Sequence, residues 1–177
     1  TVPLPEGPWR EHSVAILLQF CRVFDLPPVL AGQVAFRPPA EFRHAQAFAA
    51  AGGLGPVLMF PDSRGADREW PGFGTLTQRF LATHPAARVV WAGQKVIQAP
   101  GGLPPDRFVN LMGRTTLPEI IAALPRAALV VANDSGPMHL AAALGVRTLS
   151  LFGPTRAHMR APYPPNGDMH AALDSPD

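Results

Sequence analysis

Residues 130–145 read Val-Val-Ala-Asn-Asp-Ser-Gly-Pro-Met-His-Leu-Ala-Ala-Ala-Leu-Gly, and this stretch decides the fold. Its apolar beginning predicts a buried strand, and the part from Gly136 onward predicts a helix, because Pro137 suits a first helical turn. A helix that begins there leaves backbone N–H groups unpaired at the positive end of its dipole. The sequence therefore predicts an anion site at this loop, of the kind that binds phosphate.

Three side chains accompany the predicted helix start. Ser135 and His139 are four residues apart, so we expect them near one face, and Asp134 is placed to cap the helix or to bind a hydroxyl group of the ligand. The following residues are nearly all apolar, which predicts a helix buried on most sides and a buried His139 imidazole. Ordinary helix capping explains Asp134 and Ser135 equally well when the stretch is taken alone.

Outward from this stretch, strands alternate with helices. We expect strands at residues 57–60, 88–91, 108–110, 129–132 and 148–151, and helices at residues 74–83, 117–124 and 137–144. Such alternation predicts an α/β fold, a Rossmann-like, doubly wound parallel sheet of five to six strands with helices on both faces. The strands are nearly all apolar, as strands covered on both faces are.

The chain divides into a central core and two flanking segments. Residues 1–55 are expected to supply lead-in helices and a linker, with helices at 11–24 and 39–51 and a short extended piece between them. Residues 56–165 are expected to form the Rossmann-like core. Residues 166–177 follow several prolines and are expected to be a frayed tail or the beginning of a longer helix.

Composition excludes several classes of protein. With 177 residues, 47% of them hydrophobic, the chain can build one globular core. Its net charge of +2 and its single lysine give no basic run, so nucleic acid is not an expected partner. The one cysteine, Cys21, is expected to be a buried thiol, which leaves no disulfide and no cysteine metal site. No apolar run approaches the roughly 20 residues that a transmembrane helix needs, and no signal peptide is visible.

Two segments of the sequence resemble a known family. They are Asn-Asp-Ser-Gly-Pro-Met-His at residues 133–139, followed by Ala-Ala-Ala-Leu-Gly, and Leu-Phe-Gly-Pro-Thr at residues 151–155. Together they resemble glycosyltransferase family 9, the heptosyltransferases of the GT-B class, which move heptose from ADP-heptose onto the lipopolysaccharide core. In a parallel sheet both loops belong to the carboxyl edge, so we expect them to lie side by side.

Two further segments fit the same family. Residues 61–71 follow a predicted strand and end in Trp-Pro; by resemblance, Ser63 matches a hydroxyl position that holds the nucleotide diphosphate and Arg68 matches a basic one. Arg64 stands where the family has a second hydroxyl residue. Without the resemblance, residues 64–69 would be interpreted as a solvated surface loop. Thr115 matches a backbone contact to the base, whereas Thr116 and Glu119 form a capping box.

The resemblance implies the carboxy-terminal, donor-binding half of an inverting glycosyltransferase that uses neither a metal ion nor a cofactor. The site for its acceptor, a glycan or glycolipid, and its catalytic base would belong to an amino-terminal domain. The enzyme would act in the cytoplasm or at the inner face of the cell membrane. A face uncovered by that domain would favour self-association. The family's carboxylate for the ribose is absent, because Gln94 and Lys95 follow the strand. The residues implied in donor binding are Ser63, Arg64, Arg68, Thr115, Asp134, Ser135, Gly136 and His139.

Other functions fit less well. A serine hydrolase would need a nucleophile elbow and a separate acid to orient the histidine. A dinucleotide dehydrogenase would carry its glycines after a strand, whereas Gly53 and Gly55 precede one. A nucleotide-sugar epimerase shares the architecture but not the Leu-Phe-Gly-Pro-Thr segment. The alternative that stays open is a non-catalytic module that binds a nucleotide sugar or a protein.

Overall fold

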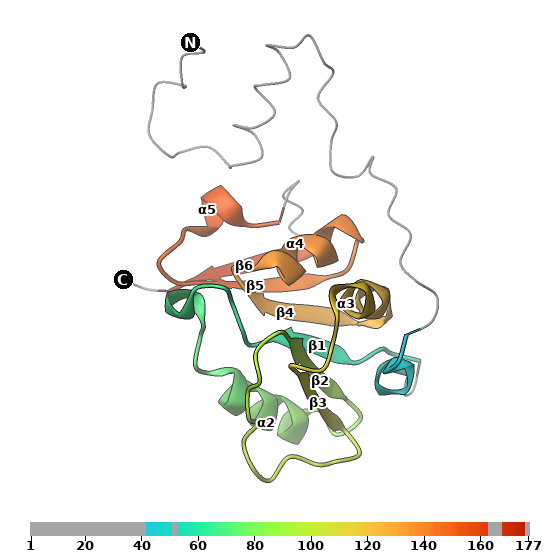
Figure 1. The fold of residues 1–177 in the computed structure, drawn as a ribbon. Helices are drawn as coiled ribbons and strands as arrows, with labels where there is room; N and C mark the ends of the chain where they lie inside the picture. The colour runs from blue at the N-terminus through green and yellow to red at the C-terminus, as the bar shows by residue number, and fades with distance from the viewer. Residues whose placement is uncertain (1–41, 51–52, 163–167, 176–177) are drawn as a thin grey trace, which may run out of the picture.

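The computed structural model describes residues 42–50, 53–162 and 168–175 (Figure 1). Its centre is a six-stranded sheet in the order β3-β2-β1-β4-β5-β6, and every neighbouring pair is parallel. The strands are β1 (Val57–Phe60), β2 (Val89–Gly93), β3 (Phe108–Met112), β4 (Leu129–Asn133), β5 (Thr148–Phe152) and β6 (His170–Asp174). The helices are α2 (Phe73–Thr83), α3 (Leu117–Ala123), α4 (Gly136–Ala143) and α5 (Ala157–Arg160), with short 3₁₀ turns η2 (Ala45–Phe48), η3 (Ala66–Arg68) and η4 (Leu124–Arg126).

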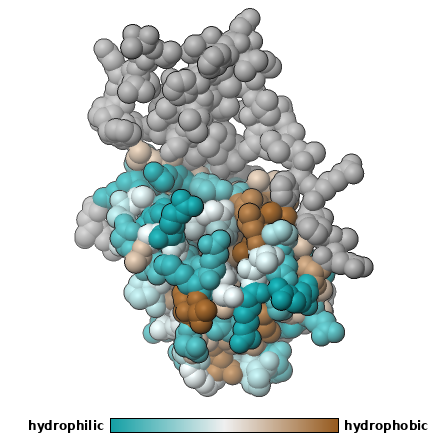
Figure 2. Space-filling view, in the orientation of Figure 1, coloured by the Kyte–Doolittle hydropathy of each residue, from teal (hydrophilic) through white to brown (hydrophobic). Residues whose placement is uncertain are grey.

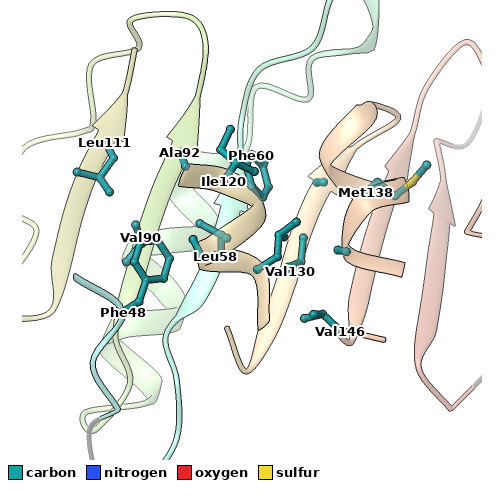
Figure 3. Packing of buried hydrophobic residues seen from close by; sticks show 14 of the residues in the cluster. Phe48, Leu58, Phe60, Val90, Ala92, Leu111, Ile120, Val130, Met138 and Val146 are labelled. Carbon is teal, nitrogen blue, oxygen red and sulfur yellow. The ribbon is translucent and has the colours of Figure 1, made fainter. Parts of the chain in front are cut away.

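One face of the sheet lies under α3 and α4. Successive strand residues point to opposite faces, so Leu58 and Phe60 of β1 share this side with Val130 of β4. They pack against Ile120 of α3 and belong to the same buried cluster as Met138 of α4 (Figure 3). These apolar contacts hold the two helices, and therefore the loops that precede them, in fixed positions on the sheet.

The opposite face lies against α2. Met59 and Trp91 point to this side and form a second buried cluster with Phe73 and Leu81 of α2. The expected doubly wound α/β fold with helices on both faces is therefore confirmed. The connection from β2 to β3, residues 94–107, is a loop without a helix (Figure 1). This is unusual, because parallel neighbours are commonly joined through a helix.

The sheet has a topological switch point. From β1 the chain adds β2 and β3 on one side, and then returns to place β4 on the other side of β1. The connections that leave the carboxyl ends of β1 and β4 therefore run in opposite directions along the sheet and leave a crevice between them. In open α/β sheets, ligands bind in the crevice at this place.

Most predicted elements agree with the structure within one or two residues, but two expectations are wrong. Residues 170–174 form β6, hydrogen-bonded to β5, where we expected a tail or a helix. The described part of the expected 39–51 helix contains only η2, although Phe48 is buried as its spacing predicted. The expected helix at 11–24, the extended piece after it and Cys21 lie outside the described residues.

The described surface carries scattered apolar side chains. On the face drawn in Figure 2, polar residues predominate and apolar ones form separate patches. The large apolar side chains that are exposed are Leu54, Trp70, Val96, Leu117 and Leu173. Within the described ranges, none of the helices is long and apolar enough to span a bilayer.

Candidate functional site

The loops after β1 and β4 are joined by a buried amide. Asn133, the last residue of β4, is fully buried. Its Nδ2 donates to the carbonyl oxygen of Pro61 at 2.9 Å, and its Oδ1 accepts the backbone N–H of Trp70 at 3.1 Å. The strand pairing that places Phe60 beside Ala132 brings these loops together, and Asn133 then fixes their separation.

Asp134 is the centre of the polar cluster at the switch point. Only 3% of this residue is exposed, and its Oδ2 accepts the Thr155 hydroxyl at 2.8 Å and Nη1 of Arg68 at 3.4 Å. The Ser63 hydroxyl donates to the Asp134 carbonyl oxygen at 3.4 Å. Loops from β1, β4 and β5 therefore meet at one carboxylate. Thr155 was missed as a site residue, although it ends the Leu-Phe-Gly-Pro-Thr segment that the sequence places at this edge.

Arg68 supplies the positive charge of the cluster. Its side chain is half-buried, and besides the ion pair its Nη1 donates to the Asp134 carbonyl oxygen at 3.3 Å. A guanidinium has five N–H donors. Among the described residues, only Nη1 is used, so the remaining donors are available for an anion. The interpretation of this segment as a solvated loop holds for exposed Arg64 but not for Arg68.

Helix α4 begins at Gly136, as predicted, with Ser135 as its N-cap. Ser135 makes no side-chain capping bond; its hydroxyl donates to the Asn133 carbonyl oxygen at 3.1 Å instead. Of the two roles expected for Asp134, helix capping is wrong, because its carboxylate binds Thr155 and Arg68; binding of a ligand hydroxyl group stays a prediction. Pro137 has no N–H group and the Met138 N–H donates to the Ser135 carbonyl oxygen at 3.2 Å. The start of α4 thus offers an anion the N–H groups of Ser135 and exposed Gly136, which have no partner among the described residues, and the positive end of the helix dipole.

His139 lies on the exposed side of α4, and the expectation of a buried imidazole is wrong. The helix buries Met138 and Ala141 on the sheet, whereas Gly136, His139 and Ala143, spaced three and four residues apart, face outward. The apolar residues around His139 do not force its burial, because most of them are alanines, whose small side chains can lie at the surface at little cost. The side chain lies one turn from the helix start.

A second charged group borders the cluster. Glu69 Oε1 accepts the Ser63 backbone N–H at 2.8 Å and Lys95 Nζ at 2.6 Å. Burial opposes ionisation of this carboxyl group, but its hydrogen bonds to Lys95 and Ser63 outweigh that effect and lower the pKa of Glu69. Sequence reasoning missed this pair, because only the folded sheet brings the loops after β1 and β2 together.

Asp62 fixes the loop that carries Lys95. Its Oδ2 accepts the backbone N–H groups of Gln94 and Lys95 at 2.8 and 3.1 Å. A Cβ atom added at Gly93 would overlap the Asp62 carboxylate. The turn after β2 therefore depends on an acidic residue at the end of β1 and on a residue without a side chain at the end of β2.

Two expected site residues lie apart from the cluster. Arg64 is exposed, and within the described chain its side chain makes no hydrogen bond. Thr115 follows β3, two strands away from β1, and its buried Oγ1 has no partner among the described residues. The neighbouring capping box of Thr116 and Glu119 is confirmed. The residues that the structure does bring together are Ser63, Arg68, Asp134, Ser135 and Gly136.

Fold and site together define a class of protein. A doubly wound parallel sheet with polar loops and a helix start at its switch point is a Rossmann-like domain of the ligand-binding type. The family model of glycosyltransferase family 9 (heptosyltransferase) matches residues 10–174, and the chain belongs to this family.

Relatives with the same family name agree with this assignment. Lipooligosaccharide heptosyltransferase 2 of Haemophilus influenzae is 31% identical over 117 residues, which is 60% of this chain and 34% of the relative. Lipooligosaccharide heptosyltransferase 2 of Campylobacter jejuni, serotype O:2, is 39% identical over 54 residues, 30% of this chain and 17% of the relative. The chain therefore matches only about a third and about a sixth of the length of these two relatives.

Solved structures show the same fold. The family 9 glycosyltransferase from Veillonella parvula matches with a TM-score of 0.69 at 21% identity, covering 99% of this chain and 52% of that one. Escherichia coli ADP-heptose LPS heptosyltransferase II gives a TM-score of 0.54 at 22% identity, covering 86% and 47%. The E. coli heptosyltransferase WaaC with ADP gives 0.58 at 19% identity, covering 95% and 52%. The chain thus spans about half of each structure.

Proposed function

We propose that this chain is the donor-binding part of a glycosyltransferase and that it binds a nucleotide diphosphate sugar similar to ADP-heptose. The observation that carries the proposal is the junction of Arg68, Ser63 and Asp134 beside the start of α4, at the switch point of a family 9 chain. It combines a fixed cation, a hydroxyl group and unpaired backbone N–H groups, which are the groups that bind a diphosphate.

Each residue has a distinct part in the proposed site. The start of α4 at Gly136 faces one phosphate group, and the unused N–H donors of Arg68 face the other. Asp134 orients Arg68 through the ion pair of 3.4 Å. Exposed Arg64 and His139 contact the outer phosphate or the sugar, and Thr115 offers backbone groups to the base.

The proposed reaction is an inverting displacement at the anomeric carbon, without a metal ion or another cofactor. Negative charge accumulates on the departing diphosphate, and Arg68 and the N–H groups of α4 stabilise it. Removal of one such donor typically slows turnover by about a hundredfold. The main binding site for the glycan or glycolipid acceptor, and the base that activates its hydroxyl group, would belong to another part of the enzyme.

The biological setting follows from the relatives. Their names place them in lipooligosaccharide synthesis, and we infer the same cell-envelope role for this chain, in the cytoplasm or at the inner face of the membrane. The assignment as a heptose enzyme rests on family membership, whereas the phosphate chemistry rests on the residues of the site.

The test is a calorimetric titration of the chain with ADP, UDP, GDP and an ADP-linked sugar in the presence of a chelator. Saturable binding that is selective for ADP would support the proposal, and it would also support independence from metals. Failure of every nucleotide to bind would contradict the donor role and favour the non-catalytic module.

Arg68→Ala is the sharpest variant for this titration. Hydrogen bonds to charged groups contribute about 1.5–3 kcal/mol, so ADP affinity should fall roughly tenfold to a hundredfold. Arg79→Ala removes an exposed arginine from α2 and should leave affinity unchanged. Because Arg68→Ala also leaves buried Asp134 without its ion pair, melting curves must show that the variant is folded at the temperature of titration. Equal ADP affinity in a folded Arg68→Ala protein would refute the role of Arg68.

A further inference from the structure

A cavity of about 480 Å³ opens on the α2 side of the sheet, near the ends of β1 and β2 and outside the group of residues assigned to donor binding. Its volume is within the range of about 300–1,000 Å³ that is typical of small-molecule sites. Aromatic residues and prolines make up half of its lining, and Glu69 and Gln98 are its principal polar residues. The rings and prolines are Trp70, Phe73, Trp91, Pro61, Pro71 and Pro100.

The cavity exists because the β2–β3 connection has no helix. Residues 97–100 of that loop form one wall in place of a helix. The loop is held in position, because Asn110 Nδ2 donates to the Ile97 carbonyl oxygen at 2.9 Å and Gln78 Nε2 donates to the Gly101 carbonyl oxygen at 3.4 Å. The wall is therefore anchored from both β3 and α2, which reduces the cost of ordering it when a ligand binds.

Trp70 presents a fixed aromatic surface to this cavity. The residue is 43% exposed, although its ring meets Phe73 at a centroid distance of 5.5 Å and an interplanar angle of 66°. A Cβ atom added at Gly72 would overlap the indole ring, so the backbone at Gly72 supports the ring closely. An exposed but immobilised indole is a stacking platform, because it makes contact with little loss of side-chain entropy.

The charges at the cavity favour a neutral ligand with hydroxyl groups. Glu69 is ion-paired with Lys95 at 2.6 Å, so neither a cation nor an anion finds an unbalanced charge there. Glu69 and Gln98 both line this space, and neither Glu69 Oε2 nor the Gln98 amide makes a hydrogen bond to another described residue. The Glu69 carboxylate can accept a hydrogen bond from a ligand, and the Gln98 amide can both donate and accept one.

We propose that this cavity binds a neutral sugar ring, stacked on Trp70 and hydrogen-bonded to Glu69 and Gln98. The C–H groups on one face of a sugar ring are weakly positive and complement the negative face of an indole. Glu69 also accepts the Ser63 N–H at 2.8 Å, which places the cavity beside the switch-point cluster. The role of this cavity as a site for part of the glycan acceptor rests on the proposed function. The binding of a sugar ring in the cavity does not depend on the proposed function.

The test is protein NMR of the whole chain without nucleotide, in which the indole N–H signals of its three tryptophans report on ligand addition. The probes are methyl glycosides of glucose, galactose and mannose, with tetramethylammonium as a cationic probe. We expect the Trp70 signal to shift saturably with at least one glycoside, with a dissociation constant on the order of 1 mM.

Variants decide whether the site is the one described. Ligand-detected saturation transfer should show that Trp70→Ala weakens glycoside binding by about tenfold or more, the equivalent of one stacking contact, whereas Trp70→Phe retains most of it. Gln98→Ala should weaken binding by a smaller factor. Leu54→Ala removes another exposed apolar side chain, at a distance from this cavity, and should have no effect.

Three results would overturn the proposal: no shift with any glycoside, glycoside binding that survives Trp70→Ala, or a shift with tetramethylammonium alone. None of these depends on ADP. Failure of the nucleotide titration would therefore leave the sugar site standing, and failure here would leave the donor site standing.

Discussion

Asn133→Ala should damage both stability and nucleotide binding, because one fully buried amide fixes two loops of the switch point. Truncation removes the donor to the Pro61 carbonyl oxygen and the acceptor of the Trp70 N–H. No other described side chain bonds to either group. The loop that carries Ser63 and Arg68 lies between these two anchor points, so its position relative to Asp134 would no longer be fixed.

The magnitude follows from the two backbone groups left unpaired. An orphaned buried group such as the Pro61 carbonyl oxygen costs about 1–3 kcal/mol, and the part-buried Trp70 N–H costs less, so the free energy of unfolding should fall by about 2–4 kcal/mol. For a chain of this size each kilocalorie corresponds to about 2–4 °C in melting temperature. Loss of alignment at Arg68 should weaken ADP binding by about tenfold in the molecules that remain folded.

Urea denaturation followed by circular dichroism and calorimetric titration with ADP measures both effects. The control is Arg107→Ala, which also removes two hydrogen bonds, in this case to the carbonyl oxygens of Leu81 and His84. Arg107 precedes β3, at the amino ends of the strands and away from the switch point. This control variant should lower stability and leave ADP affinity unchanged. An Asn133→Ala protein with wild-type stability, or with lower stability but wild-type affinity, would refute the reasoning.

Two further outcomes are expected from packing and titration. Gly55→Ala should lower the free energy of unfolding by roughly 1–3 kcal/mol, because the added Cβ would overlap the Arg126 carbonyl oxygen. The control is Gly101→Ala, whose added Cβ meets no atom, and its free energy of unfolding in urea should equal that of the wild type. Equal stabilities of the two variants would contradict this. Burial lowers the pKa of His170, whose Nδ1 lies 2.6 Å from the Thr148 hydroxyl, so the unfolded chain binds the proton more readily than the folded one. The stability that neutral His170 contributes is therefore complete above pH about 6.5 and declines as the pH falls below it. Relative to His170→Asn, the wild type should lose stability between pH 7 and pH 5 in denaturant titrations; a difference that does not change with pH would disprove the linkage.

The central strands and helix ends followed directly from the sequence. Apolar runs such as Leu129–Asn133 are long enough and uniform enough to require burial on both faces, and the Gly136-Pro137 pair marks a helix start in any context. The positions of Ser63, Arg68 and Asp134 at one place also followed, because parallel strands end at a common edge.

Other features depend on contacts that no local pattern contains. Strand β6 has the sequence His-Ala-Ala-Leu-Asp, without a β-branched residue, and it is extended only because β5 pairs with it. The Glu69–Lys95 pair joins loops 26 residues apart, and opposite charges at that separation are common in any sequence. The exposure of His139 depended on which side of α4 meets the sheet, which a nearly uniform apolar helix does not specify.

The close fit between Asp62 and Gly93 constrains how this family segment can diverge. A side chain at position 93 would overlap the Asp62 carboxylate, and loss of that carboxylate would leave the Gln94 and Lys95 N–H groups without their acceptor, so neither position can change alone without cost. We expect relatives that carry a larger residue after β2 to have lost the acidic residue after β1, so that the two positions covary across an alignment. Sequences with both exchanged would have a differently shaped turn before position 95 and would place the residue at position 95 differently relative to Glu69.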